Sequence, residues 1–124
     1  MKRTILVVED NERNRKLVRT ILTYRGFEVV ECDDGAPSLE LARKHRPALV
    51  LMDIELPTMD GITALGRLRG DPETAAIPVV AVTASVTPSE RERVAAAGFN
   101  AYLAKPIDVN AFNETVDRLV GATA

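Results

Sequence analysis

Short apolar runs recur along the chain, and each is rich in β-branched or aliphatic residues. Runs that are continuous rather than alternating are typical of strands buried on both faces of a parallel sheet. Each run is only four or five residues long, which is the length of a strand rather than of a helix. We therefore predict five strands, over Thr4–Val8, Glu28–Cys32, Ala48–Met52, Val79–Thr83 and Ala101–Ala104.

A segment that is helical in pattern follows each of these runs. The first carries an apolar stripe of Leu17, Val18, Ile21 and Leu22, and Phe112, Val116, Leu119 and Val120 line the last. Glycine and proline fall near the segment ends, as they do where helices and strands stop. Five β-α repeats of about 25 residues predict an α/β fold with a doubly wound parallel sheet and helices on both faces.

Length and charge narrow the class of protein. A chain of 124 residues fits one compact domain, which we expect to span residues 1–124. A net charge of −2 gives no electrostatic basis for nucleic-acid binding. The N-terminus lacks a signal-peptide core, and no run of about 20 apolar residues occurs. We expect a soluble, cytoplasmic protein with no nucleic-acid or membrane partner.

Chemically active side chains stand at the carboxyl ends of the predicted strands. Ligands bind to open parallel sheets at that edge, near the point where the strand order reverses. The residues there are two acids after the first strand, one acid after the third, a hydroxyl closing the fourth and an ammonium after the fifth: Glu9, Asp10, Asp53, Thr83 and Lys105.

Three clustered carboxylates repel one another unless a cation neutralises them. Mg²⁺ suits such a site, because it uses one or two carboxylates and completes its shell with water and phosphate oxygens. We expect Asp10 and Asp53 as direct ligands, with Glu9 acting through water or orienting Asp10. A carboxylate can also be a nucleophile that forms an aspartyl phosphate, and Mg²⁺, Lys105 and Thr83 would each meet one developing phosphoryl charge.

Four stretches carry a resemblance to a known family: ILVVEDN (5–11), VLMDIELPTMDG (50–61), PVVAVTA (78–84) and AYLAKPI (101–107). In this order, with Asp53, Thr83 and Lys105 spaced 30 and 22 residues apart, they resemble the receiver domain of bacterial response regulators. The segment from Glu9 to Leu17 is similar to single-domain cell-cycle regulators of that family, and also to receivers of hybrid histidine kinases.

The resemblance implies a flavodoxin-like (CheY-like) sheet in the order 2-1-3-4-5 and a role in two-component phosphorelay signalling. Asp53 would accept a phosphoryl group from a histidine kinase or a histidine phosphotransferase. Mg²⁺ would be required, Mn²⁺ could substitute for it, and the backbone carbonyl of Glu55 would be a further metal ligand. Side chains at Glu55 and Ser85 would tune hydrolysis of the aspartyl phosphate.

The family also implies a switch. The phosphoryl group would draw the Thr83 hydroxyl inward, and Tyr102 would fill the space left behind. This would remodel the face formed by the fourth helix, fifth strand and fifth helix, which an unidentified downstream protein would read. The Lys105–Pro106 bond is a candidate for the cis isomer. The segment Ser85–Ser89 departs from the usual family pattern.

Other interpretations remain open. Asp53, Glu55, Thr83 and Lys105 also follow the order of groups in haloacid-dehalogenase-type phosphatases, but those enzymes place their further acidic pair after the lysine, and here it precedes, at Glu9-Asp10. A flavin-binding protein would need a Ser/Thr/Gly-rich loop after the first strand. We therefore predict a switch rather than an enzyme, limited to Mg²⁺-dependent self-phosphorylation and autodephosphorylation, and either stand-alone or cut from a hybrid kinase.

Three minor features have simpler interpretations. Asp33-Asp34-Gly35 is typical of a turn, and Cys32 of a small buried hydrophobic residue with no redox role. The first helix is strongly basic, which indicates a solvated face or a surface that docks on an acidic kinase or phosphotransferase; its cations are Arg13, Arg15, Lys16, Arg19 and Arg25.

Overall fold

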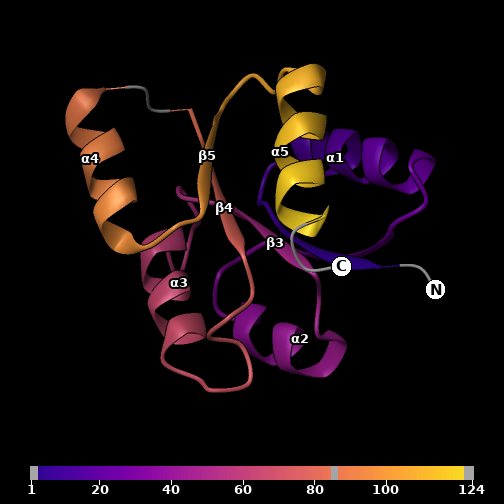
Figure 1. Cartoon of the computed structure of the whole chain (residues 1–124). Helices are drawn as coiled ribbons and strands as arrows, with labels where there is room; N and C mark the ends of the chain where they lie inside the picture. The colour runs from indigo at the N-terminus through magenta and orange to yellow at the C-terminus, as the bar shows by residue number, and fades with distance from the viewer. Residues whose placement is uncertain (1–2, 85–86, 122–124) are drawn as a thin grey trace.

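Strands and helices alternate along the whole of the described chain (Figure 1). The structure is a computed structural model, and it describes residues 3–84 and 87–121. The strands are β1 (Thr4–Val8), β2 (Glu28–Cys32), β3 (Leu49–Asp53), β4 (Val79–Thr83) and β5 (Ala101–Ala104). The helices are α1 (Glu12–Tyr24), α2 (Ser38–His45), α3 (Gly61–Arg69), α4 (Pro88–Ala97) and α5 (Val109–Gly121).

All strand pairs are parallel, and the sheet order is β2-β1-β3-β4-β5. This confirms the predicted fold and strand order. The order reverses between β1 and β3, so β1 continues to β2 on one side while β3 continues to β4 on the other. The chain therefore leaves the carboxyl ends of β1 and β3 toward opposite edges of the sheet, and open parallel sheets bind their ligands at such a point.

The two faces of the sheet are covered by different helices (Figure 1). Alternate residues of a strand point to opposite faces, so Ile5 and Val7 pack against α1 and α5, whereas Leu6 and Val8 pack against α2 and α3. Helix α4 contributes Val94 to a smaller cluster beside the carboxyl ends of β3 and β4. Because the sheet is covered on both faces, β1, β3 and β4 are almost fully buried.

The helix starts are capped by side chains. Asn11 accepts a hydrogen bond from the Asn14 N–H before α1, Asp60 does so from Thr63 before α3, and Thr87 from Glu90 before α4. Each cap satisfies one of the N–H groups that have no partner within the helix. The cap of α1 immediately follows Asp10, and the cap of α3 closes the loop that follows Asp53, so both help to fix loops at the candidate site.

Four expectations need correction. The third strand runs from Leu49 to Asp53 rather than from Ala48 to Met52, so Asp53 is its last residue and is held by the sheet. Leu17 is 40% exposed and lies outside the buried stripe of α1. Strand β2 is only half-buried because it forms an edge of the sheet, and Cys32 on it is half-buried too. Burial nevertheless raises the pKa of the Cys32 thiol to about 11.

No helix within residues 3–84 and 87–121 is both long and apolar enough to cross a membrane.

Candidate functional site

The predicted site residues meet at the carboxyl edge of the sheet. Glu9, Asp53 and Thr83 are buried there, with exposed fractions of 4%, 3% and 2%. Asp10 is exposed, and Lys105 is half-buried. Polar groups are rarely buried to this degree unless they have partners or a function. The site is therefore a cluster of buried acids that opens to solvent at Asp10.

The three acids lie close enough together to share a cation. One carboxylate oxygen each from Glu9, Asp10 and Asp53 lies within 4.8 Å of the others. All three are hard oxygen ligands, which is the donor type that Mg²⁺ prefers. This donor set fits a magnesium ion. The Glu55 N–H donates to Oδ1 of Asp53 at 2.9 Å, which fixes the start of the loop that follows β3.

Lys105 neutralises part of the acidic cluster. Its Nζ lies 2.9 Å from Oδ2 of Asp53 and 2.9 Å from Oε1 of Glu9. Burial lowers the pKa of Lys105, but its hydrogen bonds to Glu9 and Asp53 and their charges outweigh burial and raise that pKa above its usual value. Lys105 is therefore an ammonium at neutral pH. The Lys105–Pro106 peptide bond, singled out above as a candidate, is cis.

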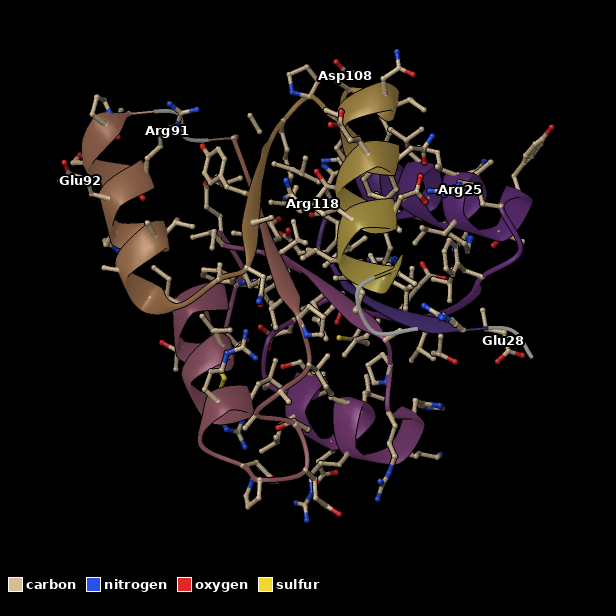
Figure 2. All side chains as sticks on the ribbon, in the orientation of Figure 1. Arg25, Glu28, Arg91, Glu92, Asp108 and Arg118 are labelled. Atoms are coloured by element: carbon tan, nitrogen blue, oxygen red, sulfur yellow. The ribbon has the colours of Figure 1, made fainter. Side chains whose placement is uncertain are left out.

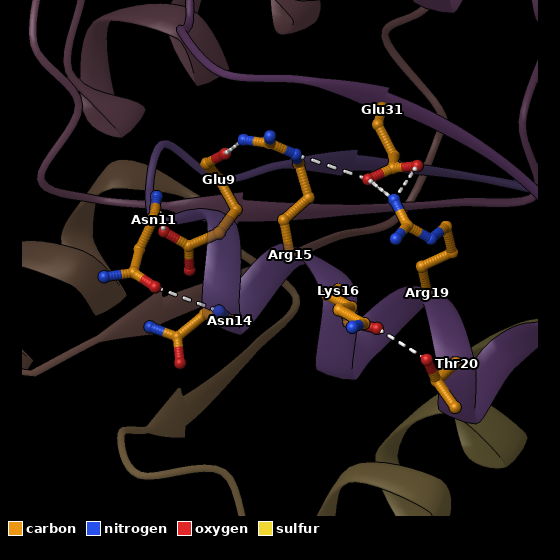
Figure 3. Close-up of polar contacts among 8 residues, drawn as sticks. All are labelled: Glu9, Asn11, Asn14, Arg15, Lys16, Arg19, Thr20 and Glu31. Atoms are coloured by element: carbon orange, nitrogen blue, oxygen red, sulfur yellow. Dashed lines mark hydrogen bonds and ion pairs between the residues drawn. The ribbon is translucent and has the colours of Figure 1, made fainter.

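Glu9 is fixed by its own loop and by α1 (Figure 3). The Asn11 N–H donates to Oε2 of Glu9 at 3.1 Å, and Arg15 donates from Nη1 to the Glu9 carbonyl at 2.9 Å. Arg15 also pairs with Glu31 on β2 through Nε, at 3.3 Å. Burial raises the pKa of Glu9 to about 7, with a further contribution from Asp53 and an opposing one from Lys105. Glu9 therefore keeps its proton to a higher pH than an ordinary glutamate does.

The basic face of α1 is only partly solvated. Arg15 and Arg19 both pair with Glu31, and Figure 3 shows the two guanidinium groups on either side of that carboxylate. Arg25 pairs with Asp117 on α5 and stacks over the Phe27 ring, 5.6 Å from its centre. The sequence pattern did not indicate the acidic partners, Glu31 and Asp117, because they are distant along the chain from the arginines.

Thr83 on β4 and Tyr102 on β5 lie on neighbouring strands, on the side of β3 away from β1. The Lys105 N–H donates to the Thr83 carbonyl at 2.9 Å, which ties the end of β5 to the end of β4. Tyr102 is half-buried, and the guanidinium of Arg91 on α4 lies over its ring, 5.5 Å from the centre. A groove of about 360 Å³ between α4 and β5 is lined by both residues together with Val94 and Phe99. Ser85 lies outside the described residues.

Asp34 has a structural role that the sequence pattern did not indicate. The Asp33-Asp34-Gly35 segment does turn, but Oδ1 of Asp34 also accepts hydrogen bonds from the N–H groups of Thr58 and Met59. These two residues belong to the loop that follows Asp53. A turn motif is a local signal, and nothing local to Asp34 indicates a partner 24 residues away.

Comparison with known proteins assigns this arrangement to a family. The family model described as the response regulator receiver domain matches residues 5–117. The polar-differentiation response regulator DivK of Brucella anthropi is 42% identical over 121 residues, covering 98% of each chain. DivK of Brucella ovis is 41% identical over the same length and share.

Two solved structures show the same fold. The receiver domain of a sensor histidine kinase from Pseudomonas aeruginosa PAO1, solved with a magnesium ion coordinated in its active site cleft, has a TM-score of 0.90 and 32% identity, over 98% of this chain and 99% of that one. A response regulator from Chloroflexus aurantiacus has a TM-score of 0.92 and 29% identity, with the same coverage.

Proposed function

The chain belongs to the response regulator receiver domain family of two-component signalling, and we propose that it is a phosphorelay switch whose phosphoryl acceptor is Asp53. It is a receiver rather than a conventional enzyme. The observation that carries the assignment of Asp53 is its position: a buried carboxylate at the end of the central strand, 2.9 Å from the Lys105 ammonium and within the acidic cluster.

The surroundings of the three acids favour Asp53 as the nucleophile. Asp10 is exposed, and the raised pKa of Glu9, about 7, makes it partly protonated near neutral pH. Asp53 is oriented by the Glu55 N–H on one oxygen and by Lys105 on the other. Its register partner on β4 is Val82, so Thr83 follows directly beside it.

The donor would be a phosphohistidine on a histidine kinase or a histidine phosphotransferase. A carboxylate oxygen of Asp53 forms the new bond to phosphorus while the phosphorus–nitrogen bond breaks, and the electron pair returns to the imidazole, which takes up a proton. The product is an aspartyl phosphate. Such transfers depend on positioning and on neutralising charge rather than on acid–base groups.

Asp10, Asp53 and the Glu55 backbone carbonyl would hold Mg²⁺, or Mn²⁺ in its place, with Glu9 acting through water or orienting Asp10. The ion, when bound, neutralises charge on the phosphoryl oxygens. Lys105, which pairs with two carboxylates in this structure, would turn its ammonium to a phosphoryl oxygen, and the Thr83 hydroxyl would donate to another.

The output would be a change of surface. As Thr83 moves toward the phosphoryl group, Tyr102 would turn inward and remodel the face of α4, β5 and α5. Figure 2 shows charged side chains on and beside the helices that flank β5, with Arg91 and Glu92 on α4, Asp108 just before α5 and Arg118 on α5. A downstream protein, rather than nucleic acid or a membrane, would read this face.

We place the protein in the cytoplasm and interpret residues 1–124 as one receiver unit that acts alone. The DivK similarity over nearly its full length supports a single-domain regulator. The similarity to the receiver of a sensor histidine kinase supports the alternative, a receiver that is part of a hybrid kinase.

Phosphorylation from a small-molecule donor tests the acceptor. With Mg²⁺ and phosphoramidate or acetyl phosphate, the wild type should gain the mass of one phosphoryl group, and Asp53→Asn should gain none. Asp33→Asn, which changes an exposed aspartate outside the cluster, is the matched control and should label like the wild type. Equal labelling of Asp53→Asn and the wild type would show that Asp53 is not the acceptor. Steady turnover of a phosphomonoester would instead indicate a phosphatase.

A further inference from the structure

The loop after β2 supplies no candidate ligand, yet it contacts the loop that does. Oδ1 of Asp34 accepts three backbone hydrogen bonds: from Gly35 at 2.7 Å, from Met59 at 3.1 Å and from Thr58 at 3.3 Å. The Met59 N–H, followed by those of Gly35 and Thr58, holds the pKa of Asp34 below its usual value. Asp34 therefore accepts these hydrogen bonds as an ionised carboxylate, and charge-assisted hydrogen bonds of this kind are stronger than neutral ones.

Gly35 lets the two loops approach each other closely. A Cβ atom at this position would lie 2.4 Å from the Met59 carbonyl oxygen and 3.1 Å from the Cβ of Ala64. The nearer atom belongs to the backbone and cannot move aside alone. Two successive residues, Asp34 and Gly35, are therefore matched to the same stretch of the loop after β3.

That loop, residues 54–60, is also fixed at its two ends, and the partly buried Met59 side chain packs against the core. The Ile54 N–H donates to the Val82 carbonyl at 3.1 Å, and the Gly61 N–H closes the loop by donating to the Ile54 carbonyl at 3.0 Å. Leu56 is buried in the core. After Leu56 in the chain, the hydrogen bonds to Asp34 hold the backbone of Thr58 and Met59.

We propose that Asp34 is a positioning residue for the cation site: by holding residues 58 and 59, it keeps the loop in the shape that presents the Glu55 carbonyl beside Asp10 and Asp53. The proposal rests on the function proposed above, because it assigns the Glu55 carbonyl to the metal. Asp34 itself touches neither the acidic cluster nor the phosphoryl group.

The test compares two neighbouring aspartates. Asp34→Asn and Asp33→Asn each remove one negative charge, from adjacent positions in the loop after β2. Asp33 is exposed, and it accepts no hydrogen bond from residues 3–84 or 87–121. Long-range electrostatics therefore affects both variants alike, and only Asp34→Asn weakens the contacts with the loop.

The measurement is the affinity for Mg²⁺ alone, followed by NMR of the backbone amides, together with the Mg²⁺ dependence of labelling by phosphoramidate. Loss of a partner that touches a ligand directly costs about 10–100-fold in metal affinity. Because Asp34 acts through the loop, we expect a smaller loss, roughly three- to tenfold, for Asp34→Asn. Asp33→Asn should stay within about twofold of the wild type, as expected for a screened surface charge.

Two further readouts separate positioning from general stability. At saturating Mg²⁺ the labelling rate of Asp34→Asn should approach the wild-type rate, so that the half-saturating Mg²⁺ concentration changes more than the maximal rate. The amides of Thr58 and Met59 should exchange faster with solvent in Asp34→Asn, while the Thr63 amide at the start of α3 should be unchanged.

A second variant keeps the test decisive if Asp34→Asn does not fold. Gly35→Ala leaves every charge in place but pushes on the Met59 carbonyl, and it should weaken Mg²⁺ binding in the same direction. In the wild type itself, linkage requires Mg²⁺ to slow exchange at Thr58 and Met59.

Equal Mg²⁺ affinity in Asp34→Asn and Asp33→Asn, or no effect of Mg²⁺ on the Thr58 and Met59 amides, would overturn this proposal alone. A wild type that neither binds Mg²⁺ nor becomes labelled would instead overturn the proposed function.

Discussion

The ammonium of Lys105 lies 2.9 Å from Oδ2 of Asp53, and the same nitrogen lies 2.9 Å from Oε1 of Glu9. The protein thus supplies a cation of its own between two buried carboxylates. Without this ammonium, the two buried carboxylates would repel each other. A metal ion held by the acidic cluster would share with Lys105 the neutralisation of these acids, and each would affect the binding of the other.

Replacing Lys105 with methionine should destabilise the metal-free protein and strengthen Mg²⁺ binding. We expect a loss of about 1–3 kcal/mol in the free energy of unfolding, less than for a fully buried pair because Lys105 is partly exposed. Mg²⁺ should restore most of this loss, since it takes over the neutralisation. Urea unfolding with and without Mg²⁺ measures both effects. Lys44→Met, on the exposed side of α2, is the control, and weaker Mg²⁺ binding by Lys105→Met would contradict the expectation.

Stability of the metal-free protein should fall as the pH rises from 4.5 to about 7, because Glu9 titrates differently in the folded and unfolded chains. Burial raises the Glu9 pKa from 4.5 to about 7, so the folded chain binds more protons than the unfolded chain within this window. The contribution of Glu9 is complete below 4.5 and is lost as the pH rises through 7. Mg²⁺ affinity should change in the opposite direction and weaken below pH 7, because protons compete for Glu9.

Glu9→Gln is the matched variant for this pH dependence, because glutamine stays neutral at every pH. The change in unfolding free energy between about pH 5 and about pH 8 should be smaller in Glu9→Gln than in the wild type. Identical pH profiles for the two proteins would show that Glu9 is not the group responsible.

Two glycines of α3 should respond in opposite directions to alanine. At Gly61 a Cβ would lie 2.5 Å from the Asp53 carbonyl oxygen and 2.9 Å from the Ile54 Cα, both of them backbone atoms. Gly61→Ala should therefore cost about 1–3 kcal/mol. A Cβ at Gly66 would have no described atom within 4 Å apart from the adjoining turns of its own helix, so Gly66→Ala should stabilise the helix by about 0.5–1 kcal/mol. Urea unfolding checks both, and a stabilising Gly61→Ala would contradict the close approach.

Removing the guanidinium above Tyr102 should favour the inward orientation of this ring. A cation–π contact at an exposed site contributes about 0.5–1 kcal/mol, so Arg91→Ala should shift the Tyr102 equilibrium roughly two- to fivefold. The chain has two tyrosines and no tryptophan, so Tyr24→Phe leaves Tyr102 as the only fluorescent reporter. Arg93→Ala, which loses a pair with Glu90 on the same helix, is the control. Equal emission from the Arg91 and Arg93 variants would argue against the contact.

The strands could be predicted from the sequence because their signal is local. Buried runs such as Val79–Val82 are apolar throughout, as is typical of strands in a sheet covered on both faces. The limits of the strands were harder to predict, since Ala48, just before β3, and Asp53, its last residue, are equally compatible with strand and loop. Leu17 was misassigned because it lies at the margin of the apolar stripe, where a helical pattern does not separate a buried position from an exposed one.

The contacts that support the site could not be predicted in this way. Glu9, Asp53 and Lys105 could be predicted to lie together because the carboxyl ends of parallel strands meet at one edge of the sheet. No such principle applies to Arg15 and Asp34. In the sequence, Arg15 is one cation of a basic helix and Asp34 is part of a turn, and their partners become apparent only when the packing of separate elements is known.

Asp53 ends a strand that is paired on both sides, with β1 through residues such as Val8 and Met52 and with β4 at Asp53 itself. Its main chain cannot shift without breaking hydrogen bonds to two neighbours. Within the described residues, strand β5 pairs with β4 alone, and Tyr102 lies on it. The two halves of the site therefore differ in mechanical freedom. If Asp53 takes up the phosphoryl group as proposed, we expect its half to stay in place as a fixed reference, and the displacement that a partner senses to arise at the free edge.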